Sequence, residues 1–242
     1  MARKPALIAD SEGAVGITRA SAVYEALRSD ILQGVFKPSE KLRVEMMGQR
    51  HGVGASPVRE ALSRLSAEGL VLRNEQRGFS VAPLVWEDLA VLTQTRCDVE
   101  SLALRDAIAH RNAEWEESLA LTVHRLSRTP RSLDSTQYLP NPLWEKLHAE
   151  FHQRLLAQCT SRWLREFCAA LTVDAYRYRQ VAASRNFSRR HTHEEHVAIF
   201  QAAIHGRSDE AVSLLCQHYQ RTSHTVAATA ADAASTTVPT GD

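Results

Sequence analysis

The distribution of glycine along this 242-residue chain is the feature that most constrains its fold. Six glycines punctuate residues 17–83, whereas the sequence from there to about residue 229 consists mainly of Ala, Leu, Arg, Glu and His with little Gly. Because glycine ends helices and permits tight turns, the first segment predicts short elements and the second predicts long helices. We therefore expect a small mixed domain at residues 17–83 and an all-helical domain at residues 84–229, with the boundary near Pro83 to Trp86.

Three helices followed by two short strands are expected in the first segment. Val23, Leu27 and Ile31 recur at the spacing of one helix face, and Gly34 ends that helix. Alternating apolar and polar residues after the third helix indicate a two-stranded ribbon. The remaining expected elements are helices over Val44–His51 and from an N-cap at Ser56 to Gly69, and strands over Leu70–Arg73 and Phe79–Ala82. This order of elements is typical of a winged helix-turn-helix domain.

Six long helices with short connections are expected in the second segment, which makes it an antiparallel bundle and the chain mainly α. The expected helices are Trp86–His110, Ala113–Ser127, Pro142–Gln158, Ser161–Ala183, Ser188–His205 and Ser208–Thr229. The segment between the second and third of them carries two prolines and is expected to be a loop. Residues 1–16 and 230–242 have no periodic apolar face and are expected to be disordered tails.

Charge and cysteine content narrow the class of protein. Residues 17–83 hold ten Lys and Arg against seven Asp and Glu, a net of +3, while residues 84–242 have a net of −2. The formal net charge of +1 therefore conceals a mildly basic module. The apolar runs fall short of the roughly 20 residues that a membrane span needs. The four cysteines show no CxxC spacing, which favours reduced thiols in a cytoplasmic protein.

The third expected helix carries residues suited to contact double-stranded DNA, because the start of this helix enters the major groove in a helix-turn-helix. Ser56 lies where backbone N–H groups favour a phosphate, and Arg59 is one turn further along, in reach of a guanine edge or a phosphate. Arg64 lies toward the DNA backbone, and Arg77 at the wing tip is placed to enter the minor groove. The alternative for each arginine is an ion-paired or solvated surface side chain. The candidate DNA contacts are Ser56, Pro57, Arg59, Arg64, Arg77 and Gly78.

The motif PVREAL followed by EGLV resembles the N-terminal domain of GntR-family transcriptional regulators. The resemblance covers about Ala20–Pro83 and implies a homodimer that binds a pseudo-palindromic operator. The chain departs from the common pattern at Ser39, at Gly48 and at Ala55, where many members carry a DNA-contacting arginine. The change at Ala55 means that a family operator sequence does not transfer directly to this chain.

Four histidines of the helical segment have the spacing of a metal site. His148 and His152 are four residues apart, so both side chains lie on one helix face. His196 and His218 are 22 residues apart on two later helices and are placed to close the site, as in bundles that build metal centres in their cores. The alternative is a set of ordinary surface or core histidines, because eleven histidines make chance pairs common.

The helical segment resembles the FCD effector domain of the FadR branch of the GntR family, over about residues 85–226. The family pattern is an Asp, a His four residues later and two further His, which together bind a divalent metal that helps hold a carboxylate ligand. His152, His196 and His218 match this pattern, and His148 stands where Asp is usual. A neutral imidazole in place of a hard oxygen makes the site softer and favours zinc or nickel over magnesium. The alternative is a metal-free site in which the histidines hold the effector directly.

Three arginines are candidate contacts for a carboxylate effector, because a guanidinium fork binds a carboxylate at two points. Arg96 resembles the arginine of the family's RxxxE motif, with Glu100 placed to orient it. Arg177 and Arg179 are further candidates, with surface or interface ion pairs as the alternative. These features predict a ligand-responsive DNA-binding regulator, with repression relieved by a small organic acid as the expected mode.

Two other classes of function compete with this one. A multi-histidine centre in a bundle can activate water in an enzyme, but that chemistry needs a general base. The nearest acids, Glu150 and Glu195, adjoin candidate ligands in sequence and are expected to point away from the metal-facing stripe, so no enzyme is expected. A purely architectural DNA binder has no use for a helical domain with an interior polar cluster.

Overall fold

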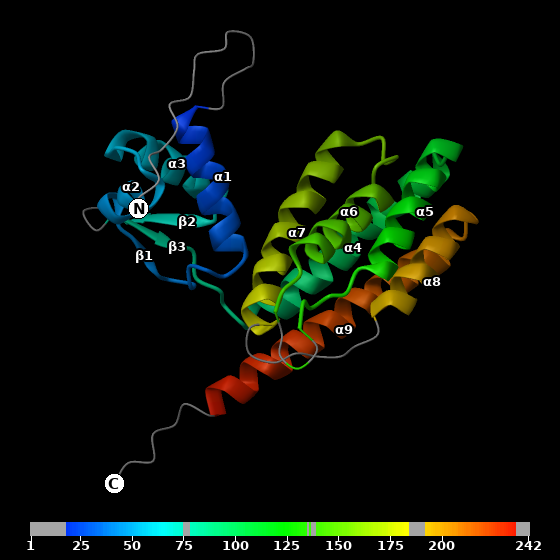
Figure 1. Ribbon diagram of the computed structural model, residues 1–242. Helices are drawn as coiled ribbons and strands as arrows, with labels where there is room; N and C mark the ends of the chain where they lie inside the picture. Colours follow the sequence, from blue (N-terminus) through cyan, green and yellow to red (C-terminus); the bar gives the residue numbers. More distant parts are fainter. Residues whose placement is uncertain (1–17, 75–77, 135, 137–138, 184–191, 236–242) are drawn as a thin grey trace. The chain divides into compact units, whose positions relative to one another are not determined.

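The computed structural model describes residues 18–74, 78–134, 136, 139–183 and 192–235 (Figure 1). The chain divides into two compact units, and the passage from the first to the second falls between Pro83 and Leu84. The expected tail at residues 1–16 lies outside the described residues. Among the described helices, none combines the length and hydrophobicity needed to cross a bilayer.

The first unit is a winged helix-turn-helix, as predicted. Its elements are α1 (Arg19–Leu32), β1 (Lys41–Leu42), α2 (Val44–His51), α3 (Ala55–Ala67), β2 (Val71–Asn74) and β3 (Gly78–Val81). The strands form one antiparallel sheet in the order β1-β3-β2. The apolar stripes of α1 and α3 supply much of the core, through Leu27, Leu62 and Leu65, which are fully buried. Short helices are only marginally stable in isolation, and burial of these apolar stripes stabilises them.

The turn between α2 and α3 depends on a glycine. Gly52 has a φ of 63°, a left-handed conformation that favours glycine and ends α2. The amide of Val53 then donates to the carbonyl of Gly48 at 2.9 Å, which closes the turn. The tight turn holds α3 in a fixed orientation against α2, as the reading helix of this motif requires.

Two details of the first unit differ from expectation. Gly54, with no side-chain cap, precedes α3, so the predicted N-cap at Ser56 is wrong and Ser56 lies inside the first turn. The sheet also has a third strand, β1, whose two residues pair with Ser80 and Phe79 of β3. A strand of two residues is too short to show a period of two, which is why the sequence pattern did not reveal it.

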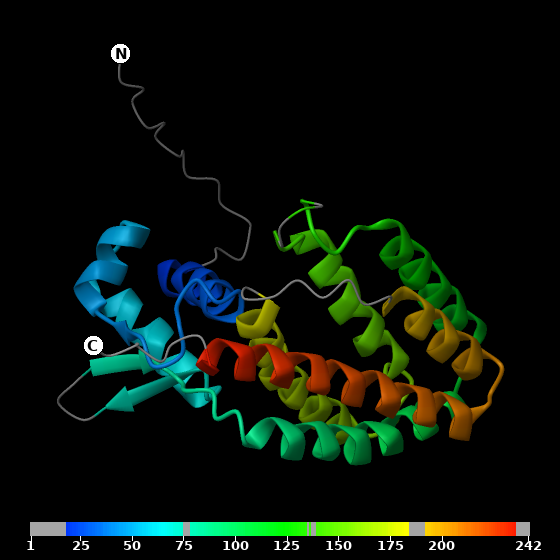
Figure 2. The ribbon, with the colours of Figure 1, turned by 90° about the horizontal axis from the view of Figure 1, so that it is seen from below.

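The second unit is the predicted all-helical bundle (Figure 2). Its helices are α4 (Asp88–Ala109), α5 (Ala113–Arg128), α6 (Pro142–Leu155), α7 (Arg162–Ala183), α8 (Thr192–Ile204) and α9 (Ser208–Ser235). Side-chain acceptors from Asn112 and Asn141 cap the first turns of α5 and α6. The core is aliphatic and aromatic, with Leu104, Leu119 and Phe151 fully buried among its members.

Among the C-termini of the bundle helices, those of α6 and α9 differ most from expectation. α6 stops at Leu155, three residues before the predicted end, where Leu156 begins a turn. The predicted tail from residue 230 is wrong over its first six residues, because α9 continues to Ser235. The sequence there is rich in alanine, the residue with the highest helix propensity, so the helix continues without an apolar stripe. Residues 236–242 lie outside the described residues.

Candidate functional site

The outer face of α3 is the candidate DNA-reading surface of the first unit. Val58, Leu62 and Leu65 are buried on the inner face. Ser56 and Arg59 are exposed on the opposite face, within the first turn and a half of the helix. In a helix-turn-helix, exposed polar groups at the start of this helix contact phosphates and the base edges of the major groove.

The other predicted DNA contacts lie in different settings. Pro57 is half-buried in the first turn of α3. Arg64 is exposed, and its guanidinium lies 4.0 Å over the ring of Tyr24 on α1, which fixes its direction. Gly78 starts β3 with a φ of 84°, so the chain turns there in a conformation that other residues avoid. Arg77 lies outside the described residues.

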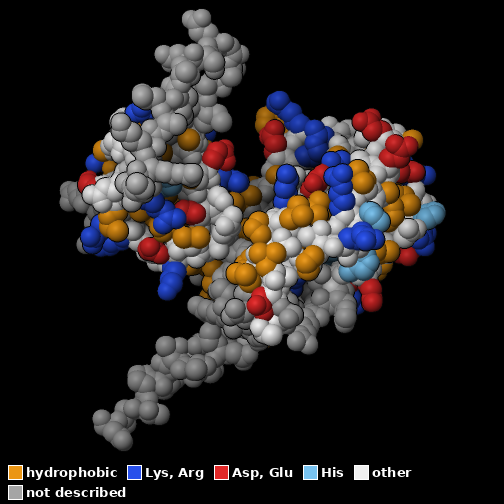
Figure 3. All heavy atoms as spheres, in the orientation of Figure 1, with side chains coloured by type: hydrophobic (Ala, Val, Ile, Leu, Met, Phe, Trp, Pro, Cys, Tyr) orange, Lys and Arg blue, Asp and Glu red, His pale blue; other side chains and the backbone are white. Residues whose placement is uncertain are grey.

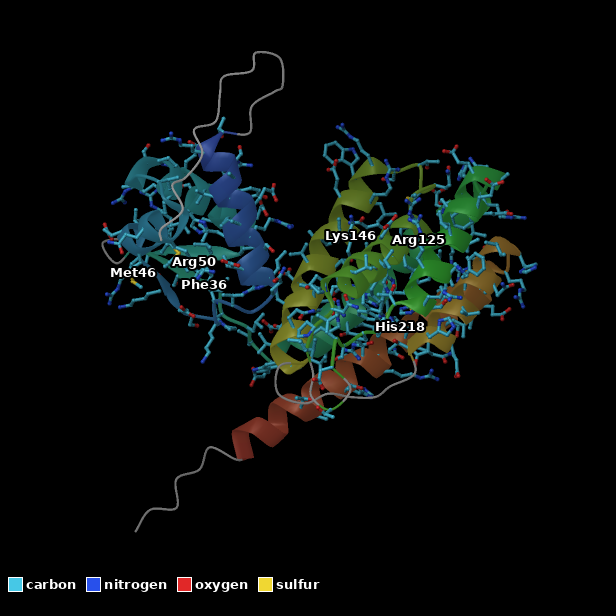
Figure 4. All side chains as sticks on the ribbon, in the orientation of Figure 1. Phe36, Met46, Arg50, Arg125, Lys146 and His218 are labelled. Carbon is cyan, nitrogen blue, oxygen red and sulfur yellow. The ribbon has the colours of Figure 1, made fainter. Side chains whose placement is uncertain are left out.

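The four predicted histidines meet in the interior of the bundle. His148 and His152 come from α6, His196 from α8 and His218 from α9, and their ligand atoms all lie within 4.8 Å of one another. Figure 4 labels His218 on α9. The ring centroids of His196 and His218 are 4.7 Å apart, and those of His148 and His196 are 5.0 Å apart. Three helices thus bring four imidazoles to one point.

Hydrogen bonds fix the orientation of two of these rings. Nδ1 of His218 lies 2.7 Å from Oε2 of Glu195, and since a carboxylate only accepts, the proton is on Nδ1 and the lone pair is on Nε2. The hydroxyl of Tyr219 donates to Glu100 at 2.5 Å, so Nδ1 of His152, 3.2 Å away, donates to the same hydroxyl oxygen. Such outer contacts are typical of metal-ligating histidines, because they fix the tautomer.

The chemistry of these rings fits a divalent cation. Nε2 of His152 and Nε2 of His196 are buried and have no hydrogen-bond partner among the described residues. Buried polar atoms are normally satisfied, so two orphaned lone-pair donors at one point need an explanation. Burial lowers the pKa of His148, His152 and His196 well below the usual value, which keeps the rings neutral at pH 7, as coordination requires.

A chain of buried polar groups runs from Arg96 to the histidines. Nε of Arg96 donates to Oε1 of Glu100 at 2.7 Å, and the other carboxylate oxygen accepts from Tyr219. The guanidinium also lies 3.9 Å over the ring of Tyr219. Burial lowers the pKa of Arg96, but Tyr219 and Glu100 outweigh burial and raise it above its ordinary value, so Arg96 is a permanent cation. Arg96 and His152 are therefore linked through two side chains.

Arg179 and Arg177 fall in different places. Arg179 donates from both terminal nitrogens to Glu145, at 2.7 and 3.3 Å, in a buried two-point ion pair. Arg177 is also buried, and burial lowers its pKa while Asp174 opposes that effect. Arg177 is not among the described residues that line the cavity beside the histidines, whereas Arg179 is. Of the two arginines that we predicted as effector contacts on α7, only Arg179 therefore lines this cavity.

A cavity of about 110 Å³ adjoins the histidines. One end is cationic and polar, with Arg96, Arg179 and His218 in its lining. The other end reaches Leu89 and Val226, which belong to a separate apolar cluster of the bundle. A site with a few converging polar groups and an apolar remainder is typical of a small-molecule pocket.

Sequence reasoning missed the residues that support the four histidines. Glu195 was expected to point away from the site, yet its side chain reaches His218 on the next helix. Tyr219 and Glu145 were not singled out, although both hold groups of the cavity in place. Glu150, by contrast, pairs with Arg154 on its own helix. One signal in the sequence could have marked Glu195 and Tyr219: each can form hydrogen bonds and is adjacent in sequence to a predicted metal-ligating histidine.

Two family profiles match the chain. The profile described as bacterial regulatory proteins of the gntR family matches residues 19–81, and the FCD domain profile matches residues 91–221. The chain is 35% identical to the uncharacterized HTH-type transcriptional regulator BphR of Paraburkholderia xenovorans (strain LB400), over 82% of this chain and 81% of that protein. It is 32% identical to the HTH-type transcriptional repressor GlaR of Escherichia coli (strain K12), over 81% of this chain and 90% of that protein.

Solved structures share the fold at lower identity. McbR/YncC of E. coli has a TM-score of 0.70 at 15% identity, over 87% of this chain and 98% of that chain. A transcriptional regulator from Rhodococcus sp. RHA1 has a TM-score of 0.65 at 22% identity, over 86% of this chain and 97% of that chain. These likenesses concern the arrangement of elements.

Proposed function

The chain belongs to the GntR family of bacterial regulatory proteins and carries an FCD domain, and from this premise we propose that it is a repressor released from DNA by a small carboxylate. It is a DNA-binding transcriptional regulator, and its named relatives are regulators and not enzymes. The name of GlaR as a repressor supports the proposed sign of regulation. We infer that the protein acts in the cytoplasm, because the operator DNA that it is proposed to bind lies there.

The observation that carries the proposed effector site is the meeting of His148, His152, His196 and His218 beside a cavity with a cationic end. These four residues would hold the divalent metal, and zinc or nickel suits an all-imidazole donor set. A bound ion supplies positive charge that an anionic ligand can neutralise. With neutral His148 in place of an Asp, the proposed site has one negative charge fewer and depends more strongly on an anionic effector to complete the shell.

We assign the carboxylate of the effector to the cavity end at Arg96. The guanidinium has five N–H donors, of which Glu100 and Thr172 accept two. Arg179, held by Glu145, lies in the same lining and contributes a second positive charge. The apolar end at Leu89 and Val226 then accommodates the hydrocarbon part of the acid.

A thermal-shift screen of mono- and dicarboxylates, with and without zinc or nickel, tests the effector site. A ligand that binds only the folded chain raises the unfolding temperature by mass action, so hits rank by affinity. At least one carboxylate should raise the midpoint more in the presence of the metal than in a chelator. If every carboxylate leaves the midpoint unchanged under both conditions, the proposed effector class is wrong.

Substitution of Arg59 tests the DNA-reading helix. Arg59→Ala should weaken binding to a duplex selected from a random-sequence pool by about 1 to 3 kcal/mol, or roughly 5- to 150-fold in Kd, at fixed salt. The reason is the loss of a base-edge or phosphate contact from an exposed residue at the start of α3. Arg125→Ala, which removes the same charge from an exposed site on α5, should leave Kd unchanged. Equal affinities for the two variants would remove Arg59 from the proposed interface.

The proposed homodimer has a candidate contact on α7. Trp163 and Phe167 lie one helical turn apart and are 68% and 50% exposed. Hydrophobic side chains gather over α7 in the space-filling view (Figure 3). Aromatic side chains are enriched in the cores of protein interfaces, and a pseudo-palindromic operator requires two symmetric reading heads.

Charged substitutions on α7 test this contact. Trp163→Asp combined with Phe167→Asp should shift the protein from dimer to monomer in sedimentation equilibrium, because an interface does not bury unpaired carboxylates. Leu121→Asp on α5 replaces a residue that is also 50% exposed and should leave the dimer intact. A double variant that sediments as a dimer, with the far-UV circular dichroism of the parent, would place the interface elsewhere.

A further inference from the structure

Two thiols meet where α4 packs against α9. Sγ of Cys97 lies 3.9 Å from the carbonyl oxygen of Cys216, and Sγ of Cys216 lies 3.8 Å from the carbonyl oxygen of Cys97. Figures 1 and 2 both show α4 and α9 side by side, and these two helices are in extensive contact. Each thiol thus contacts the backbone of the other cysteine, so the two residues face each other where the helices pack.

The four cysteines, all reduced thiols, differ in burial and in partners. Cys216 is half-buried, and the hydroxyl of Ser101 lies 3.6 Å from its sulfur. Cys97 is 5% exposed, while Cys159 and Cys168 are 1% and 2% exposed. Cys216 is therefore the more accessible thiol of the pair, and Cys97 contacts it from α4. The susceptibility of a thiol to oxidation follows its accessibility and the presence of a neighbouring resolving thiol.

We propose that Cys97 and Cys216 form an oxidation site, at which hydrogen peroxide converts two thiols into a disulfide that clamps α4 to α9. The sulfur of Cys216 attacks one peroxide oxygen, the O–O bond breaks, and the leaving hydroxide takes up the thiol proton as water, which leaves a sulfenic acid. The sulfur of Cys97 then attacks the sulfenic sulfur, the S–O bond breaks, and hydroxide leaves with the Cys97 proton as a second water. Two thiols lose two electrons, and one peroxide is reduced to two waters.

The clamp lies beside the proposed effector site without using its residues. Arg96 and Glu100 come from the same stretch of α4 as Cys97, and His218 and Tyr219 come from the same stretch of α9 as Cys216. The disulfide closes a loop of more than 100 residues, and long closed loops restrict the unfolded chain most. Oxidation therefore stabilises the bundle and fixes the separation of two walls of the cavity. The site does not depend on a bound metal or effector.

Non-reducing peptide mapping of the full chain tests the proposal. The reduced protein is treated with hydrogen peroxide, unfolded in N-ethylmaleimide and digested, and linked peptides are identified by mass spectrometry. The expected product joins the Cys97 peptide to the Cys216 peptide within one chain, and dithiothreitol reverses it. The midpoint of thermal unfolding should rise on oxidation and return on reduction.

Single serine variants provide the matched controls. Cys97→Ser and Cys216→Ser should abolish the linked peptide and the rise in midpoint, whereas Cys168→Ser should retain both. Four thiols that still react with N-ethylmaleimide after peroxide treatment would overturn the proposal. A link between Cys159 and Cys168, or a link that joins two chains only, would also overturn it. All of these outcomes are measured on the parent protein, so they do not depend on the folding of a variant.

Discussion

Replacement of His152 and His196 by alanine should abolish metal binding. The parent protein, saturated with zinc or nickel and then dialysed, should retain about one ion per chain, since a protein metal site needs at least three ligands in place. The variant His152→Ala/His196→Ala should retain none, because it removes two of the four imidazoles, including both orphaned Nε2 atoms. Elemental analysis by plasma mass spectrometry measures this directly.

An exposed histidine on the same helix as His218 supplies the control. His224→Ala should retain the ion, because His224 is exposed and lies outside the cluster. The carboxylate response in a thermal-shift assay should disappear in the double variant and persist in His224→Ala. A parent protein that takes up no stoichiometric zinc or nickel would refute the metal site and leave the metal-free alternative, in which the histidines bind the effector themselves.

Glu100→Ala should lower the free energy of unfolding of the bundle by about 3 to 5 kcal/mol, because it leaves a buried cation without its partner. Arg96 and Tyr219 both donate to Glu100, and its side chain is 1% exposed. Both donors are themselves buried, so loss of the carboxylate leaves two buried polar groups without their acceptor. Urea unfolding of the metal-free protein, followed by helical circular dichroism, measures the change.

Two control variants separate the buried pair from an ordinary ion pair. Glu100→Gln keeps an acceptor oxygen and should cost less than Glu100→Ala. Glu150→Ala breaks the partly exposed pair with Arg154 and should cost about 0 to 1 kcal/mol. If Glu100→Ala and Glu150→Ala lower the stability equally, then Glu100 is not the centre of a buried polar chain.

The fold was predictable because its signals are local. Glycines mark the turn after α2 and the end of α3, and apolar periodicity marks each long helix. The elements that the sequence did not predict depend on contacts between distant residues, or on helix propensity in a segment that has no apolar periodicity. β1 exists because Lys41 and Leu42 pair with a strand almost 40 residues away, and α9 runs to Ser235 through an alanine-rich sequence, which favours a helix.

The histidine cluster was predictable in part, because residues four positions apart on a helix, such as His148 and His152, lie on the same face. The supporting groups were not, because they reach across helices. Glu195 adjoins His196 in sequence on α8, but its carboxylate contacts His218 on α9, and helix spacing along the chain does not reveal a contact between helices. Arg177 and Arg179 are two residues apart, about 200° around a helix, so helix geometry alone allows only one of them to face the cavity.

The proposed regulation couples two sites through population shift. An effector changes DNA affinity only if it binds one arrangement of the chain better than another, and coupling energies are typically about 1 to 3 kcal/mol. Within the bundle, the chain of Arg96, Glu100, Tyr219 and His152 connects the proposed carboxylate position to the proposed metal ligands. From α4 the polypeptide leads back through Trp86 to the DNA-reading unit, which is the covalent route for such coupling.

The affinity of zinc-loaded protein for a selected duplex, with and without the best carboxylate from the thermal-shift screen, tests the central proposal most directly. Fluorescence anisotropy at fixed salt should show Kd rising roughly 5- to 150-fold with the carboxylate, the range expected for typical coupling energies. The variant His152→Ala/His196→Ala should bind the duplex with the parent Kd and show no such rise. An unchanged Kd for the parent at a saturating carboxylate concentration would contradict the proposal that this cavity controls DNA binding.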